Sequence, residues 1–245
     1  MDIKIVVVLI SGAIALLSAI LGIYNQNKIT TLNHQFNLQS RELDKKEEFE
    51  KLLSRYRDPL LRATCDFQSR LYNIIQIGFL KIHYDRSERE RDYAINNTLF
   101  VTAEYLGWIE IIRTEIQFLD LGENSLTKNF NEIIERISHI FLSAKYDLTY
   151  RLLRGEQRAI GEIMIEKSDQ RLLCIGYAEF RDKMNDSKFS FWFDTLVASI
   201  EVLAKNPESK LKRMIMLQHA LIDLIDFLDP DSIRVSANRR SKIDA

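Results

Sequence analysis

Residues 92–121 read DYAINNTLFVTAEYLGWIEIIRTEIQFLDL, and their apolar side chains cover most sides of a helix. A helix that is apolar on most sides usually lies buried at the centre of its domain. It is not a membrane span, because Glu104, Glu110 and Arg113 interrupt the apolar residues. The stretch therefore predicts the central helix of a folded domain.

Further helices are expected on both sides of this one. The 245 residues include only 8 glycines and 3 prolines, and so few helix breakers favour long helices over a turn-rich β fold. Asp58-Pro59 has the pattern of a helix start, with Asp as the cap and Pro in the first turn. Ser87 and Glu90 fit a capping box. The predicted fold class is all-α, with soluble helices over residues 60–82, 92–121, 125–141, 175–184, 190–205 and 207–228, the last started by Asn206-Pro207 and stopped by Asp229-Pro230.

Residues 150–169 have the least regular pattern in the chain. The segment 154–162, RGEQRAIGE, holds two glycines among charged residues, and apolar Ile163, Met164 and Ile165 follow it. This predicts a helix break and then a short helix, with a strand as the alternative.

The N-terminal run Ile5–Ile23 carries no charge and consists almost wholly of Val, Ile, Leu, Ala and Gly. At about 1.5 Å per residue, a helix of this length spans a hydrocarbon core of about 30 Å. A cleaved signal peptide has a shorter apolar region and a more basic start than Asp2 and Lys4 provide. A buried core helix would show one polar face. The run therefore predicts one N-terminal transmembrane helix.

Basic residues are more numerous after this run than before it. Lys4 precedes it, whereas Lys28, Arg41 and Lys45 follow it. The positive-inside rule then places the C-terminal domain in the cytoplasm. The two cysteines show no pairing pattern, which agrees with a reducing compartment.

The polar residues 25–57 contain neither Pro nor Gly and predict a helical stalk. Gln39 and Lys46 interrupt its seven-residue apolar seam, so a dimerising coiled coil is the alternative to a single helix. Small residues at four-residue spacing between Ser11 and Ala19 offer a second route to a homo-oligomer, through the transmembrane helix. The seam consists of Ile29, Leu32, Phe36 and Leu43.

Charge and motifs exclude several kinds of function. The net charge is −1, with 34 basic and 35 acidic residues, and a dedicated nucleic-acid binder would carry a basic excess. The chain has no His-x-x-x-His, no Gly-x-Ser-x-Gly and no phosphate-binding glycine loop, and its four histidines are scattered. We therefore expect no metal site, no cofactor and no nucleic-acid partner.

The candidate ligand-binding residues lie in the charged segment after residue 153: Arg154, Glu156, Arg158 and Glu162. Arg154 and Arg158 are four residues apart, as are Arg158 and Glu162, so in a helix they would form a ladder of weak charge pairs. The alternative is that the two arginines present planar forks to a phosphate or carboxylate. The ladder is the preferred interpretation, because most charge constellations are structural.

Three segments resemble an uncharacterised bacterial family of single-pass, membrane-anchored helical proteins: YRDPLLRA at 56–63, DFQSRLYN at 66–73 and RGEQRAIGE at 154–162. The resemblance covers most of the soluble part of the chain. It implies a helical protein of a bacterial inner membrane. It implies no activity, so it assigns no catalytic residue.

Four regions are expected along the chain: a transmembrane anchor at 1–27, a helical stalk at 28–57, a soluble α-helical domain at 58–230 and a flexible polar tail at 231–245. The leading hypothesis is a membrane-anchored, non-enzymatic interaction or signalling module with a protein partner. One alternative is an enzyme or anionic-ligand sensor with its site near Arg154 and Arg158. Another is a lipid-binding domain with an apolar groove that faces the membrane.

Overall fold

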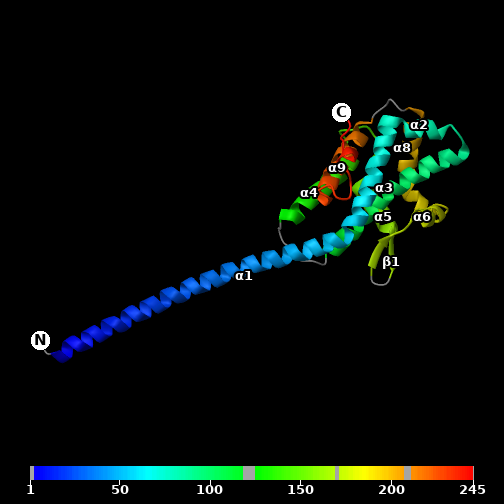
Figure 1. Cartoon of the computed structure of the whole chain (residues 1–245). Coiled ribbons are helices and arrows are strands. Elements are labelled where there is room, and N and C mark those ends of the chain that lie inside the picture. Colours follow the sequence, from blue (N-terminus) through cyan, green and yellow to red (C-terminus); the bar gives the residue numbers. More distant parts are fainter. Residues whose placement is uncertain (1–2, 118–124, 169–170, 207–210, 245) are drawn as a thin grey trace. The chain divides into compact units, whose positions relative to one another are not determined.

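The computed structural model describes residues 3–117, 125–168, 171–206 and 211–244, and Figure 1 shows its ribbon. The chain divides into two units, residues 1–47 and residues 48–245. Side chains left out of the description within these ranges are those of residues 3–11, 13–15, 19–20, 49, 52–53, 116–117, 125–126 and 168.

The chain is mostly helical, as predicted. In order, its elements are α1 (Ile3–Tyr72), the π-helix η1 (Asn73–Ile77), α2 (Phe79–Tyr84), α3 (Glu88–Gln117), α4 (Ser125–Leu142), α5 (Arg154–Ile163), β1 (Ile165–Ser168), β2 (Arg171–Cys174), α6 (Tyr177–Lys183), α7 (Ser187–Ser190), the 3-10 helix η2 (Phe191–Phe193), α8 (Asp194–Lys205), α9 (Lys212–Leu228) and the 3-10 helix η3 (Ala237–Arg239).

No helix in the described part of the chain is long and apolar enough to cross a membrane. Most side chains of the predicted span Ile5–Ile23 lie outside the described residues.

The predicted helix start at Asp58-Pro59 is wrong, because α1 continues through Pro59. A proline inside a helix removes one backbone hydrogen bond. Apolar packing on both sides of it compensates here, since Tyr56 and Leu60 are both buried. The Asp58 carboxylate does not cap a helix and instead forms an ion pair with Arg234, 2.6 Å from its Nε.

The predicted helix over residues 60–82 is interrupted near its end. A π-helical turn at Asn73–Ile77 leads to Gly78, whose φ of 72° is a left-handed conformation that favours glycine. Helix α2 follows, and α3 then begins with the predicted cap, because the backbone N–H of Glu90 donates to Ser87 Oγ at 3.2 Å. The Glu90 carboxylate binds His83 Nδ1 at 2.7 Å.

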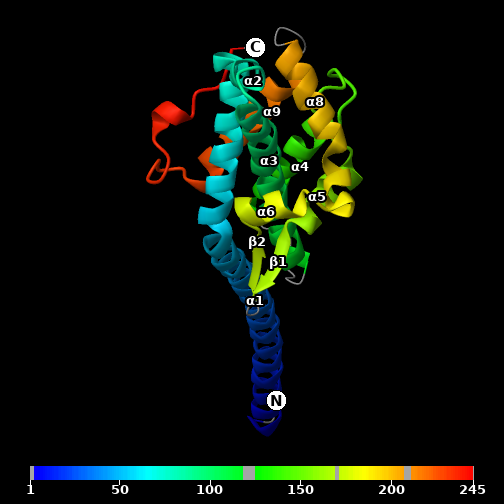
Figure 2. The ribbon, with the colours of Figure 1, turned by 90° about the vertical axis from the view of Figure 1, so that its right-hand side faces the viewer.

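Helix α3 is central to the second unit, as its apolar sequence predicts. It packs against α2, α5, α6, α8 and β2. The aromatic contacts Phe67–Tyr105 and Tyr56–Trp108 join it to the C-terminal part of α1. Figure 2 shows α3 beside this part of α1, with α5 and α6 close by.

A small antiparallel hairpin is the exception to the all-α prediction. Strands β1 and β2 pair from Ile165 with Cys174 to Ser168 with Arg171. A short helix is present as α5, but the predicted helix break at the two glycines is wrong, because Gly155 and Gly161 both lie inside α5. The strand that was the alternative is present as β1, which begins at Ile165. The hydrogen bond from Ile175 N–H to the Met164 carbonyl, at 2.9 Å, extends the hairpin by one pair, and Leu172 and Cys174 pack the hairpin on the core.

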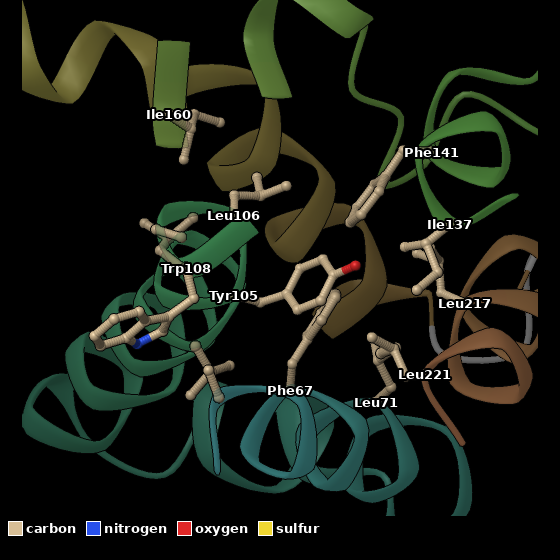
Figure 3. Packing of buried hydrophobic residues seen from close by; sticks show 14 of the residues in the cluster. Phe67, Leu71, Tyr105, Leu106, Trp108, Ile137, Phe141, Ile160, Leu217 and Leu221 are labelled. Carbon is tan, nitrogen blue, oxygen red and sulfur yellow. The ribbon is translucent and has the colours of Figure 1, made fainter. Parts of the chain in front are cut away.

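The core of the second unit is centred on aromatic rings from three helices, α1, α3 and α4. The Phe67 ring lies 5.6 Å from Tyr105 and stacks on Phe141 at 6.1 Å. Figure 3 shows these rings pointing toward one another, with Ile137, Leu217 and Leu221 beside them. Helices α4 and α9 pack on each other and supply these aliphatic neighbours.

The C-terminal segment 231–244 differs from the expected flexible tail, because it packs along α9. Its apolar residues Val235 and Ile243 are buried. His219 Nε2 donates to the Ile243 carbonyl at 2.6 Å, and Gln218 Nε2 donates to the Ser241 carbonyl at 2.9 Å. Polar side chains on α9 thus bind the backbone of a segment whose sequence has little apolar character.

Candidate functional site

A polar pocket of about 410 Å³ lies between the end of α1 and the C-terminal segment. Three side-chain amides, three hydroxyls and one guanidinium surround it. No aliphatic side chain lines it, so its chemistry suits a small polar molecule more than a hydrocarbon. Its lining residues are Gln68, Ser69, Tyr72, Asn73, Asn238, Arg239 and Ser241.

Helix α1 supplies one wall of the pocket. Gln68, Ser69 and Tyr72 lie within about one helical turn of each other, so they share a face of α1. Phe67 and Leu71 point to the other side and belong to the core. The same apolar periodicity that buries one face of α1 therefore leaves these polar residues on the pocket side.

The buried Asp229 positions the other wall. Its carboxylate accepts hydrogen bonds from the backbone N–H groups of Ile233, Arg234 and Val235 at 3.0, 3.1 and 2.9 Å. It also forms an ion pair with Arg240 at 2.6 Å. Burial raises the pKa of Asp229, but these N–H groups and the Arg240 guanidinium together lower it below its usual range. The turn after α9 is thus built around one carboxylate, which sets the place of η3 and Arg239.

Arg239 is the one cationic side chain among the residues that line the pocket. Its Nη2 donates to Ser69 Oγ at 3.4 Å, and no carboxylate among the described residues forms an ion pair with it. Its charge acts on Cys65 and Asp66 of α1. Burial raises the pKa of Asp66, and Arg239 opposes that rise. An exposed guanidinium among amides and hydroxyls can accept a small anion in a planar, bidentate manner.

Cys65 lies beside this wall but does not supply a nucleophile. Burial raises the pKa of its thiol to about 11, although the positive charge of Arg239 opposes the rise. The thiol is therefore protonated at neutral pH, and a thiol is a far weaker nucleophile than a thiolate. Burial and the nearby Glu104 likewise raise the pKa of Cys174.

Arg70 is a buried cation near the end of α1, and it contacts α2 and α3. It is nine-tenths buried, its Nη2 donates to Asn97 Oδ1, and its guanidinium lies 3.9 Å from the centre of the Phe79 ring. Its Nη1 has no hydrogen-bond partner among the described residues. Burial lowers its pKa. Cation–π attraction to the Phe79 ring therefore acts together with the hydrogen bond to Asn97 to hold the guanidinium in place.

The structure separates the four candidate residues predicted from the sequence. Arg154 makes two hydrogen bonds to the Glu135 carboxylate of α4, at 3.1 and 2.9 Å. Its fork is therefore occupied by a carboxylate of the chain itself. Glu156 accepts from the backbone N–H of Leu153 at 2.6 Å, which caps the start of α5.

Arg158 and Glu162 form the other predicted contact. They are four residues apart on α5, and their nearest charged atoms are 3.9 Å apart in an exposed position. Arg154 and Arg158 do not share a partner, because Arg154 binds Glu135 and Arg158 binds Glu162. The arrangement is that of two separate surface ion pairs, one between helices and one within α5.

Among the described residues, metal-ligating side chains come together neither at the polar pocket nor at the charged segment of α5. Nowhere in the described ranges do three or more His, Cys, Asp or Glu residues lie close enough to hold a metal ion.

The pocket was missed from the sequence, although part of its signal was visible. Gln68, Ser69, Tyr72 and Asn73 appear as the polar face of a predicted helix. Arg239 appears in a segment predicted to be flexible, and its approach to Ser69 joins residues 170 positions apart. No family model, no curated protein and no solved structure matches this chain.

Proposed function

We propose that this chain is a non-enzymatic helical interaction or signalling module at a bacterial inner membrane. Its N-terminal helix is the anchor, and residues 48–245 lie in the cytoplasm. The uncharged run Ile5–Ile23 and the basic residues that follow it support this placement.

The extent of α1 is the observation that carries the proposal. One unbroken helix, Ile3–Tyr72, contains both the uncharged run and the pocket residues Gln68, Ser69 and Tyr72. A ligand or partner that binds at the pocket would therefore contact the same helix that carries the proposed anchor. Such an arrangement suits transmission of a signal more than turnover of a substrate.

Membrane extraction tests the anchor. The full-length protein should remain in the membrane pellet after an alkaline carbonate wash. The double variant Ile14→Arg with Leu17→Arg should be released, because each central arginine costs about 2.5–3.5 kcal/mol on insertion scales. Ile14→Leu with Leu17→Ile is the matched control and should stay in the pellet. Wild-type protein in the soluble fraction would refute the anchor.

A reporter fusion tests the orientation. An enzyme that is active only in the periplasm should be silent when it is fused after Ala245, since the positive-inside rule retains the C-terminus in the cytoplasm. A strong periplasmic signal would reverse the orientation.

The pocket favours binding of a small anion as a second candidate function. Arg239 has no ion-pair partner in the described part of the chain, whereas the fork of Arg154 is filled by Glu135. We therefore place an anion-binding site at Arg239 rather than at Arg154 and Arg158. Calorimetric titration of the full-length protein with phosphate and with malonate tests this.

Arg239→Gln and Arg154→Gln form a matched pair for that titration. Arg239→Gln should lower the affinity at least about tenfold, because it removes a charge-assisted bidentate contact. Arg154→Gln should leave the affinity unchanged. The opposite result would move the site to α5, and no heat with either anion would remove this candidate.

A further inference from the structure

The first unit exposes a line of large apolar side chains on α1. Ile29, Leu32, Phe36 and Leu43 are 57%, 54%, 70% and 66% exposed. They recur at intervals of three, four and seven residues, so they lie on one side of the helix. Exposure of these apolar side chains to water is unfavourable, so burial of them against another surface would be favourable.

The sequence of this part of α1 is a poor helix former on its own. Residues 25–40 contain four Asn, two Thr, one Ser and one His, which is 8 of 16 residues. All of these residue types have low helix propensity, because they lose rotamer freedom or bind the backbone in non-helical conformations. Most helices in proteins depend on packing for their stability. A helix through residues 25–40 would therefore be stabilised by a surface that packs on it.

We propose that the surface is a second copy of the same chain, paired as a parallel, in-register, two-stranded coiled coil over residues 29–47. The parallel direction rests on the proposed function, since two copies anchored in one membrane by the positive-inside rule point the same way. Ile29, Phe36 and Leu43 then occupy a positions, and Leu32, Gln39 and Lys46 occupy d positions.

Of the two polar core positions, Gln39 complements itself in this pairing. Gln39 faces Gln39 of the second copy, and a side-chain amide carries both donors and an acceptor. Lys46 faces Lys46 of the second copy, and Glu47 of each copy borders the hole that receives the opposite ammonium, which offsets the repulsion between the two lysines. Glu42 and Glu47 of opposite copies also lie near each other, and the two ammonium groups offset their repulsion.

These polar positions also determine the register. A shift by one heptad would place Gln39 opposite Leu32 or Lys46 and would bury an unpaired amide. A polar residue at a core position of a coiled coil specifies register in this way, at a cost in stability. The features that interrupt the apolar seam are thus the ones that define a single pairing.

Disulfide cross-linking of the full-length protein in its own membrane tests the pairing. Leu32→Cys and Leu43→Cys place a thiol at a d and an a position, and His34→Cys places one on the outer face. Cys65 is buried, and the parent chain with its two natural cysteines is the background control. Under copper–phenanthroline, both seam variants should form disulfide-linked dimers, whereas His34→Cys and the parent should give less than about a tenth of that yield.

Self-cross-linking at both seam positions requires parallel chains in register, because an antiparallel pair can bring at most one position opposite itself. Dimers from only one seam variant, or equal dimers from His34→Cys, would overturn the proposal. A second pair of variants tests the seam independently. Phe36→Asp should abolish the Leu32→Cys dimer, whereas Leu38→Asp, which lies outside the seam, should preserve it.

Fractionation of the same samples separates this proposal from the anchor. Cross-links at both positions in a protein found in the soluble fraction would support the dimer and refute the anchor. A membrane-bound protein without cross-links would retain the anchor and refute the dimer, and the seam would then bind a different chain.

Discussion

Arg213 of α9 is a fully buried arginine whose partners are backbone carbonyls. Its Nε donates to Thr149, its Nη1 to Ile140 and Phe141, and its Nη2 to Ser143 and Asp147. The last carbonyls of a helix lack partners within the helix and carry the negative end of its dipole. Burial lowers the pKa of Arg213. One guanidinium therefore caps α4 and organises the loop after it.

Arg213→Lys should destabilise the protein strongly, because an ammonium has three donors and cannot reach five carbonyls. Each buried carbonyl left without a donor costs about 1–3 kcal/mol, so we expect a loss of at least about 3 kcal/mol. Urea unfolding of the full-length protein in mild detergent, followed by circular dichroism, measures it. Arg136→Lys is the control, since its exposed ion pair with Asp223 should be worth less than about 1 kcal/mol. Equal stability of the two variants would disprove this role for Arg213.

Glu104 is a partly buried acidic residue in the apolar middle of α3. Burial raises its pKa to about 7 from an ordinary value of 4.5, and Asp66 adds to the rise while Arg62 opposes it. Because the folded state favours the protonated form, ionisation destabilises the fold. Stability due to this group is present below about pH 4.5 and is lost as the pH rises through 7.

Glu104→Gln should therefore be more stable than the wild type at pH 8, and the difference should shrink as the pH falls toward 5. Melting temperatures of both proteins at pH 5, 6, 7 and 8 measure the trend. The exposed Glu179→Gln, which loses a surface pair with Lys183, should show no such slope. A Glu104→Gln variant that is less stable at every pH would show that the carboxylate makes a favourable contact in its ionised form.

At the scale of elements, α3 and α5 cross so closely that the crossing depends on glycine. A Cβ at Gly161 of α5 would lie 2.8 Å from both Glu110 Cβ and the Leu106 carbonyl of α3. A Cβ at Gly107 of α3 would meet Cys174 Sγ at 2.8 Å. Helix α5 contains two glycines, Gly155 and Gly161, which suggest a helix break in the sequence. Only Gly161 lies at the crossing with α3, because no atom lies within 4 Å of a Cβ at Gly155.

Gly161→Ala and Gly155→Ala should change stability in opposite directions. Gly161→Ala forces α3 and α5 apart and should cost about 1–3 kcal/mol, the usual penalty of overpacking. Gly155 has nothing within 4 Å of a Cβ, so Ala there should stabilise α5 by about 0.5–1 kcal/mol. Thermal unfolding of both variants decides the matter. Stabilisation by Gly161→Ala would mean that the helices can separate without cost.

At the scale of the second unit, segments far apart in the chain depend on each other. Asp58 of α1 pairs with Arg234, and Arg239 reaches Ser69. Asp229 binds the backbone of the turn after α9, and this turn brings Arg234 and Arg239 close to α1. The polar pocket exists only because the C-terminal segment returns to α1, so the site belongs to the unit and to no single element.

Local patterns determined the position of most helices. Ser87 caps α3, α9 ends at Leu228 before Asp229-Pro230, and the apolar residues of 92–121 form a central helix. Each of these features depends on side chains within a few residues of one another, so spacing alone carries the information. The predicted end of that helix at residue 121 lies outside the described residues.

Only the tertiary structure decided the features whose partners lie far away in the chain. Packing of Tyr56 and Leu60 carries α1 through Pro59, and Tyr150 takes a left-handed φ of 60° because Thr102 and Ser199 bind its hydroxyl and its N–H. In the sequence, no local pattern distinguishes Arg213 or Arg239 from the other charged residues. Partners that lie 48 to 170 residues away leave no periodic pattern in the sequence. The free energy that selects the conformation of such a residue comes from burial and hydrogen bonds that exist only after folding.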